Sequence, residues 1–213
     1  MTGQRSTALL LAVFFVCSAL GRASMAVGIP LMVAAGLGIP LLWAWRTQRW
    51  RETGFTLINM GAVIRWSLIA GVFTAGLGIA LIGRIAIPSD LPLQMIVGAV
   101  IWFGVASPFQ EFFFRAWLQT RLIQTIGAWP ALLLATGLFT VWHYVAPLNT
   151  VAVPLDTVQG LLGTFLAGFV YGIAFQRTTS VVTPWVAHAI AGMAFVFIGA
   201  IDFVAEFARF WPF

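Results

Sequence analysis

Long apolar stretches divide most of this chain of 213 residues. A helix needs roughly 20 mainly apolar residues to cross the hydrocarbon core of a bilayer, and about seven stretches approach that length. We place them at residues 7–21, 25–45, 66–82, 92–118, 126–145, 158–175 and 181–203. Another apolar stretch follows the first within a few residues, so we interpret the first as a retained helix and not as a secretory signal. The pattern predicts a chain that crosses a membrane repeatedly.

Composition excludes the main alternatives to a membrane protein. Apolar residues make up 61% of the chain and charged residues 8%, whereas soluble domains carry about 25% charged residues. Disorder requires low hydrophobicity, and the net charge of +5 is not gathered in a run that could follow a nucleic-acid backbone. We therefore predict an all-α, polytopic transmembrane helical bundle of about seven spans. It forms one membrane-embedded domain over residues 1–213, with the lipid bilayer around it and no nucleic-acid partner.

The arginines predict the orientation of the bundle, because cytoplasmic loops carry an excess of basic residues. With the N-terminus inside, the cytoplasmic side holds Arg5, Arg46, Arg49, Arg51, Arg65, Arg121 and Arg177. The other side then holds Arg22, Arg84 and Arg209, with Asp90, Asp156, Asp202 and Glu206. Seven against three favours N-in, C-out. All 11 basic residues are arginine, as in proteins of GC-rich bacteria, so we expect an integral protein of the bacterial inner (cytoplasmic) membrane.

Four ionisable side chains inside the predicted spans are candidates for a functional site, because such groups are costly there. They are Glu111, Arg115, His143 and His188. If the fourth and fifth spans form a hairpin that turns at Gly127, Glu111 lies 16 residues before the turn and His143 16 residues after it. Antiparallel helices then bring the two to one depth. Counted from the cytoplasmic ends of their own spans, Glu111 and His188 both lie roughly 15 Å deep.

One carboxylate and two imidazoles at one level favour hydrolytic chemistry. Glu111 and a histidine can share a water and deprotonate it for attack on an amide carbonyl, while the second histidine stabilises the oxyanion. Alternatively, Glu111, His143 and His188 could hold zinc with an open position, although no His-Glu-x-x-His pair is present. A third interpretation is structural: Glu111 and Arg115 form an ion pair on one helix, and the histidines are satisfied core residues.

The order and spacing of these residues resemble a known family. The motifs are Gln110-Glu111-x-x-x-Arg115, then Phe139-x-x-x-His143, then His188-x-x-x-Gly192. Within residues 105–195 this set is similar to the CPBP intramembrane proteases, which include CaaX prenyl endopeptidases and bacteriocin-processing or immunity-type homologues. Their pattern is Glu-Glu-x-x-x-Arg, Phe-x-x-x-His and His-x-x-x-Asn. The chain departs from it at Gln110 and at Gly192.

The resemblance implies a glutamic-type intramembrane endopeptidase without an obligatory metal. Its substrate would be a membrane-associated protein or peptide, such as a C-terminal sorting helix or a leader peptide. The family pattern assigns water activation to position 110 with His143, and oxyanion stabilisation to His188 with position 192. Gln110 cannot take a proton from water, and Gly192 has no side-chain donor. The catalytic residues that we expect are therefore Glu111, His143, His188, Gln110 and Arg115.

Two alternatives to this enzyme stay open. The chain could be a catalytically inactive membrane binding or immunity protein of the same family. It could also be a small transporter, although we find no inverted repeat. Gln110 itself has three explanations: a branch of the family in which Glu111 is the base, an inactive form, or an engineered isosteric replacement of glutamate.

Overall fold

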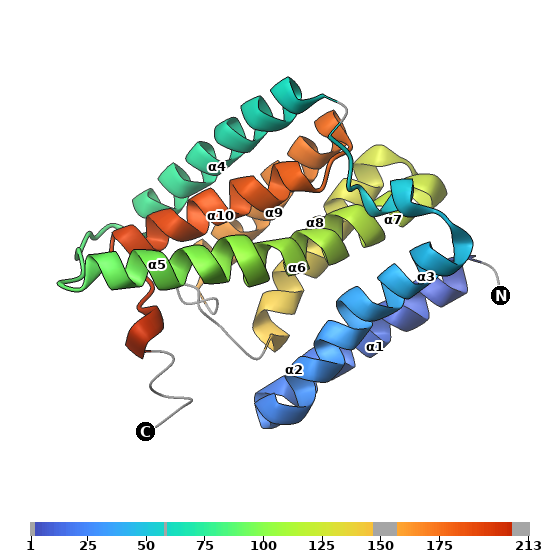
Figure 1. Cartoon of the computed structure of the whole chain (residues 1–213), viewed down its shortest axis with the longest axis horizontal. Helices are drawn as coiled ribbons and strands as arrows, with labels where there is room; N and C mark the ends of the chain where they lie inside the picture. The colour runs from blue at the N-terminus through green and yellow to red at the C-terminus, as the bar shows by residue number, and fades with distance from the viewer. Residues whose placement is uncertain (1–2, 58, 147–156, 206–213) are drawn as a thin grey trace.

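The computed structural model describes residues 3–57, 59–146 and 157–205, and all regular structure in them is helical (Figure 1). Short π-helical or 3₁₀ turns join some of the helices. The helices are α1 (Gly3–Ala23), α2 (Met25–Val33), α3 (Ile39–Thr47), α4 (Met60–Ile82), α5 (Leu91–Ile101), α6 (Ser107–Glu111), α7 (Thr120–Ile126), α8 (Ala128–Val145), α9 (Val158–Thr178) and α10 (Val182–Phe197). The turns are η1 (Ala34–Gly38), η2 (Trp50–Thr53), η3 (Trp102–Ala106) and η4 (Phe112–Gln119).

The central element is a continuous helical rod, Leu91–Ile126, of 36 residues. It is built from α5, α6 and α7 with the π-helical turns η3 and η4 between them. π-helical turns inside α-helices occur mostly at functional sites, and here they flank the five residues of α6, which end in Gln110 and Glu111. Pro108 lies in the first turn of α6, where its missing N–H removes a hydrogen bond that the regular helix would make. The predicted fourth span, 92–118, is therefore part of a longer helix.

The predicted fold class is confirmed. Six of the described helical segments are long and apolar enough to cross a membrane, and α10 is a shorter apolar helix. The last predicted span, 181–203, was too long, because α10 ends at Phe197. Beyond it the backbone N–H of Ala86 donates to the carbonyl of Ile198, 2.9 Å away, which ties the chain to the segment before α5. The predicted single domain and the predicted orientation are not tested by these helices and stay predictions.

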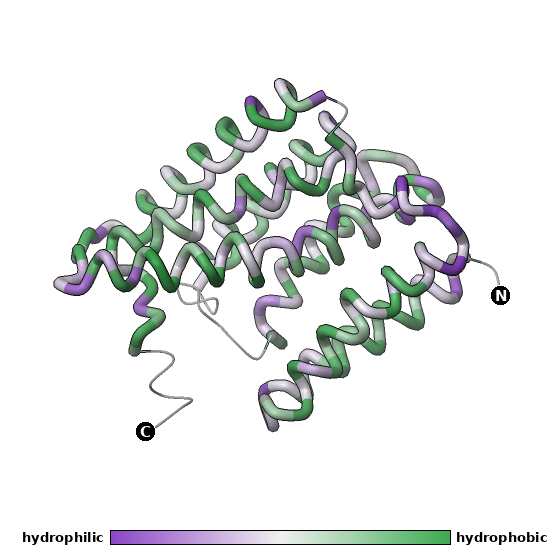
Figure 2. The backbone as a smooth tube through the Cα atoms, viewed as in Figure 1, coloured by the Kyte–Doolittle hydropathy of each residue, from purple (hydrophilic) through white to green (hydrophobic). Residues whose placement is uncertain are grey.

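Arginines gather at one end of the bundle, which we call the arginine end. A backbone hydrogen bond of 2.8 Å from Val181 to Gly54 joins the connection before α4 to the connection between α9 and α10. The guanidinium of Arg121 lies over the rings of Trp43 and Trp117, at 4.1 and 5.0 Å. Hydrophilic residues also concentrate at this end in Figure 2, while the middle of the bundle is mainly hydrophobic. The arginine end comprises Arg46, Arg49, Arg51, Arg65, Arg121 and Arg177.

The opposite end of the bundle, which we call the acidic end, is held by a buried glutamine. The side-chain amide of Gln94 donates to Asp90 (3.1 Å) and to Asp202 (2.7 Å). Its oxygen accepts from the backbone N–H of Phe203 at 3.1 Å. The segment after α10 is therefore fixed to the start of α5, which gives the end of the last helix a defined place.

The N-terminal helix α1 packs against the rod and α8 through aromatic rings. The Phe14 ring stacks on Phe113, with centroids 3.8 Å apart, and on Trp142 at 5.9 Å. The Trp142 indole donates to the Ser18 hydroxyl at 2.9 Å. Within a bilayer, helices associate by such packing and by hydrogen bonds, since lipid is as apolar as the side chains. Phe14 therefore couples the N-terminal hairpin to the helix that carries His143.

We expect Phe14→Ala to destabilise the fold by roughly 3 kcal/mol, at the lower end of the range for buried Phe→Ala changes. The side chain is fully buried, so its loss leaves a cavity between α1, the rod and α8. Val16→Ala is the matched control, because Val16 is 59% exposed on the same helix. The free energy of unfolding in bicelles, measured by steric trapping, tests this. Equal effects of the two changes would contradict the packing described.

Candidate active site

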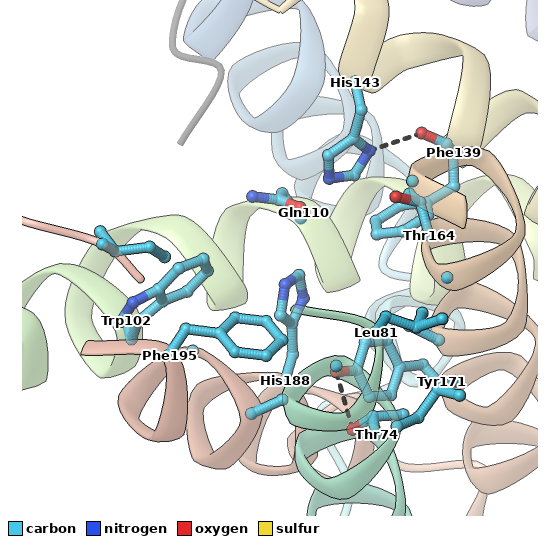
Figure 3. Close-up of a pocket in the computed structure, with 18 of the residues that line it drawn as sticks. Thr74, Leu81, Trp102, Gln110, Phe139, His143, Thr164, Tyr171, His188 and Phe195 are labelled. Atoms are coloured by element: carbon cyan, nitrogen blue, oxygen red, sulfur yellow. Dashed lines mark hydrogen bonds between the residues drawn. The ribbon is translucent and has the colours of Figure 1, made fainter. Parts of the chain in front are cut away.

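A cavity of about 120 Å³ lies between α4, α8, α9, α10 and the rod. Five of the motif positions singled out by the sequence line it: Gln110, Phe139, His143, His188 and Gly192. Figure 3 shows the His188 imidazole rising from α10 toward Gln110 and His143, which approach from the opposite side. The predicted meeting of the three motifs in one place is therefore observed. Glu111 is not one of the lining residues, but its carboxylate contacts the imidazole of His188.

Glu111 connects two of the motifs. Its side chain is 0% exposed, and its Oε1 lies 2.8 Å from Nδ1 of His188. Its Oε2 lies 3.1 Å from Nε of Arg115, which is also 0% exposed. A carboxylate only accepts hydrogen bonds, so His188 donates Nδ1–H to it and keeps its Nε2 lone pair free of that contact. The sequence interpretation placed a water between Glu111 and a histidine; the structure joins Glu111 to His188 directly.

Arg115 supplies the charge that allows a carboxylate to be buried here. Guanidinium stays protonated in proteins, and an uncompensated buried charge is strongly destabilising. The Arg115 guanidinium also lies 4.7 Å from the centre of the Phe139 ring, which is a cation–π contact. The first motif is therefore held against the second by Arg115, and against the third by Glu111.

Aromatic rings fix the plane of the His188 imidazole. Tyr171 stacks on it with centroids 4.9 Å apart and an interplanar angle of 22°. Trp102 lies at 5.4 Å. The Tyr171 hydroxyl donates to Thr74 at 3.1 Å, and Thr74 in turn donates to the carbonyl of Ala70 at 2.7 Å. Trp102, Tyr171 and Thr74 carry no signal in the sequence, since aromatic and hydroxyl residues are ordinary in apolar spans.

His143 lies near the end of α8, and its ring also has a defined orientation. Nδ1 lies 2.8 Å from the carbonyl oxygen of Phe139 (Figure 3). Because a carbonyl can only accept, Nδ1 carries the proton and Nε2 keeps a lone pair. The Phe139 ring contacts His143 edge to face, with centroids 4.4 Å apart. The spacing Phe-x-x-x-His therefore places the aromatic and the imidazole on one helix face.

Gln110 presents an uncommitted amide to the cavity. It is 9% exposed, and its Oε1 is buried without a hydrogen-bond partner among the described residues. Leaving a buried polar group unsatisfied costs about 1–3 kcal/mol, so such a group is suited to bind a ligand. A primary amide both donates and accepts, as a peptide group does. Gln110 can therefore bind either the carbonyl oxygen or the N–H group of a peptide bond.

The structure explains why glycine stands at position 192. The Trp102 indole lies directly against Gly192, and a Cβ there would overlap the Cδ2 and Cε2 atoms of the ring. The resemblance implies asparagine at this position, and the Trp102 ring fills the space that its side chain would need. The departure at Gly192 is thus linked to a residue of the central rod.

The arrangement does not fit a zinc site. Among the described residues, no three His, Cys, Asp or Glu side chains come together in a way that could hold a metal ion. Oε1 of Glu111 and Nδ1 of His188 face each other at hydrogen-bonding distance, so neither atom is directed at a shared point in the cavity. We derive no step through a metal; the absence of a cofactor itself stays a prediction.

Comparison with protein families gives a match to part of the chain. The family model for type II CAAX prenyl endopeptidases, Rce1-like, matches residues 92–194, just under half of the chain. The matched segment runs from the rod to α10 and contains Gln110, Glu111, His143, His188 and Gly192. No curated protein and no solved structure matches the chain significantly. Residues 92–194 thus match the Rce1-like model of type II CAAX prenyl endopeptidases, in agreement with the intramembrane-protease resemblance predicted from the motifs.

Proposed function

We propose that this chain is an intramembrane endopeptidase that hydrolyses a peptide bond in a membrane-associated polypeptide. The observation that carries the proposal is the Glu111–His188 pair, whose 2.8 Å contact orients an imidazole toward the cavity. A buried carboxylate that orients a histidine is the arrangement by which hydrolases create a general base. Here the molecule that this base deprotonates is water, because no serine or cysteine lines the cavity among the described residues.

The proposed reaction balances without a cofactor. Water attacks the carbonyl carbon of the substrate, and its proton passes to Nε2 of His188. Glu111 stabilises the imidazolium that forms, and the Arg115 guanidinium compensates the negative charge of Glu111. The C–N bond of the tetrahedral intermediate then breaks, and His188 returns the proton to the departing nitrogen. The products are a carboxylic acid and an amine.

Gln110 and His143 complete this scheme. We assign to Gln110 the donation of a hydrogen bond from Nε2 to the carbonyl oxygen, where negative charge develops. His143 accepts a hydrogen bond from the attacking water, since its Nδ1–H is already donated to Phe139. In this assignment Glu111 is a positioning residue that acts through His188. The water activation that the family pattern assigns to position 110 with His143 is carried out in this proposal by His188, which Glu111 orients.

A non-catalytic binding protein of the same family is the second candidate. Two observations favour it: position 110 carries an amide, and Trp102 fills the space beside Gly192. The same cavity would then bind a peptide segment without cutting it. Sorting helices and leader peptides remain the substrate classes that we propose for the enzyme. Cleavage of a substrate by this chain, or its absence, separates the enzyme from the binding protein.

We expect Glu111→Gln to lower cleavage by about 10²-fold or more, because general acid–base catalysis contributes 10²–10⁴-fold. Cleavage is measured in membranes on a panel of co-expressed single-span proteins, by mass spectrometry of new termini, with and without chelator. Glu52→Gln is the control, since Glu52 pairs with Arg49 at the arginine end. In the double change Glu111→Gln/Arg115→Gln the buried charge is removed together with its partner. Recovery of cleavage in the double variant would contradict the role of Glu111.

Two substitutions of Gln110 test whether this residue acts as a hydrogen-bond donor or whether the position requires a base. Gln110→Leu removes the amide and is expected to lower cleavage about 10²–10³-fold, the usual cost of one oxyanion donor. Gln110→Glu also lowers it, because an ionised carboxylate cannot donate. The same assay in membranes measures both changes. Cleavage that begins only with Gln110→Glu would instead show that the chain as given is inactive.

A further inference from the structure

The cavity lies in the half of the bundle farther from the arginine end. On α4 the lining residues begin at Thr74 and run toward the C-terminal end of the helix, away from Arg65. On α9 they begin at Gln159, whereas Arg177 lies in the last turn. In the rod, Gln110 precedes Arg121. On α4, on α9 and on the rod, the lining residues are therefore all displaced away from the arginine end.

We place the mouth of the cavity at Gln159, the one exposed side chain among its described lining residues. This side chain is exposed and lines the cavity, and it lies in the first turn of α9. At 1.5 Å per residue, the 18 residues from Gln159 to Arg177 span about 27 Å, close to the thickness of the hydrocarbon core. From this mouth the cavity leads to Gln110 and His188, which are buried. Gln159 and the arginine end thus lie near opposite faces of the membrane.

The wall of the cavity indicates what can enter. Among its described lining residues none is Asp, Glu, Lys or Arg. A charged side chain placed there would have no partner, and burying an unpaired charge costs far more than burying a neutral group. The wall therefore suits an extended, uncharged peptide segment.

We propose that the cavity is entered from the non-cytoplasmic side of the membrane, and that its substrate is an uncharged segment of a polypeptide on that side. The arginine end is cytoplasmic by the rule that basic residues stay inside, so the mouth at Gln159 faces the other compartment. That this segment is cut rests on the proposed hydrolysis, whereas the side from which it enters does not. The site thus acts on polypeptides that have already been moved across the membrane or inserted into it.

Cysteine labelling tests the side of entry without using activity. Cys17 is the single cysteine of the chain, so Cys17→Ala gives a cysteine-free background. Gln159→Cys and Thr47→Cys then report on the mouth and on the arginine end. A membrane-impermeant maleimide is expected to label Gln159→Cys in intact bacterial cells, and to label Thr47→Cys only in inverted membrane vesicles. Labelling of Gln159→Cys only in inverted vesicles would overturn the proposal.

A second set of positions tests the cavity itself. Thr164→Cys and Ala167→Cys place thiols on the lining of α9, and Leu162→Cys places one on the exposed face of the same helix. Both lining thiols are expected to react from the same side as Gln159→Cys, while the thiol at position 162, in lipid, does not react. Charged reagents are expected to react with the lining thiols more than ~10-fold more slowly than neutral reagents of equal size, relative to Gln159→Cys. Labelling of both lining thiols from the cytoplasmic side, or of neither, would overturn the proposal, as would equal rates for charged and neutral reagents.

Failure of the proposed hydrolysis remains distinguishable from failure of this proposal. The labelling pattern is measured again with Glu111→Gln/Arg115→Gln added, which removes the group that orients the proposed base without leaving a buried charge unpaired. We expect the same pattern. If no substrate is cut while this pattern holds, the side of entry stands and the cavity belongs to a binding protein. Loss of the pattern in a variant that is otherwise present in the membrane counts against the side of entry.

Discussion

The buried carboxylate of Glu111 is the interaction on which the rest of this site depends. An ionised group without exposure to water must find its compensation within the protein. Arg115 provides the opposite charge, and His188 provides a hydrogen-bond donor from a helix 77 residues away in sequence. Arg115 in turn lies against Phe139. One carboxylate therefore requires that the rod, α8 and α10 meet at a single depth.

The cavity is a consequence of this meeting. His188 is held on its Nδ1 side by Glu111 and on its faces by Tyr171 and Trp102. Its remaining nitrogen is the part of the ring that can act on a ligand. Gln110 precedes Glu111 by one residue and therefore lies on a different face of α6, toward the cavity. In the proposed function, neighbouring positions of one short helix thus have different roles: Glu111 positions His188, and Gln110 contacts the ligand.

The polar part of the site was predictable from the sequence, and the apolar part was not. Equal spacing about Gly127 placed Glu111 and His143 at one depth, and that turn is observed with a φ of 84°. The arginine markers placed Glu111 level with His188, as their 2.8 Å contact confirms. Polar residues in an apolar span are rare, so each one carries positional information. Which histidine would bond to Glu111 was not predictable, since both lie at the right depth.

Trp102 and Tyr171 illustrate the limit of the sequence analysis. In a chain with 10 tryptophans, no pattern distinguishes the one whose ring replaces a side chain at position 192. The relation of Trp102 to Gly192 joins residues 90 positions apart in the sequence, and it becomes apparent only when the rod and α10 are packed together. The early end of α10 has a similar cause, because a backbone contact with Ala86 follows the helix.

The protonation of His188 tests the central claim most directly. The chain has two histidines, so His143→Gln leaves His188 as the single imidazole for solid-state ¹⁵N NMR in bilayers at neutral pH. The account predicts a neutral ring with the proton on Nδ1, coupled to Glu111, and an unprotonated Nε2 facing the cavity. The change Glu111→Gln should shift the equilibrium between the Nδ1–H and Nε2–H tautomers of His188. A proton found on Nε2, or on both nitrogens, would contradict the assignment of His188 as the base.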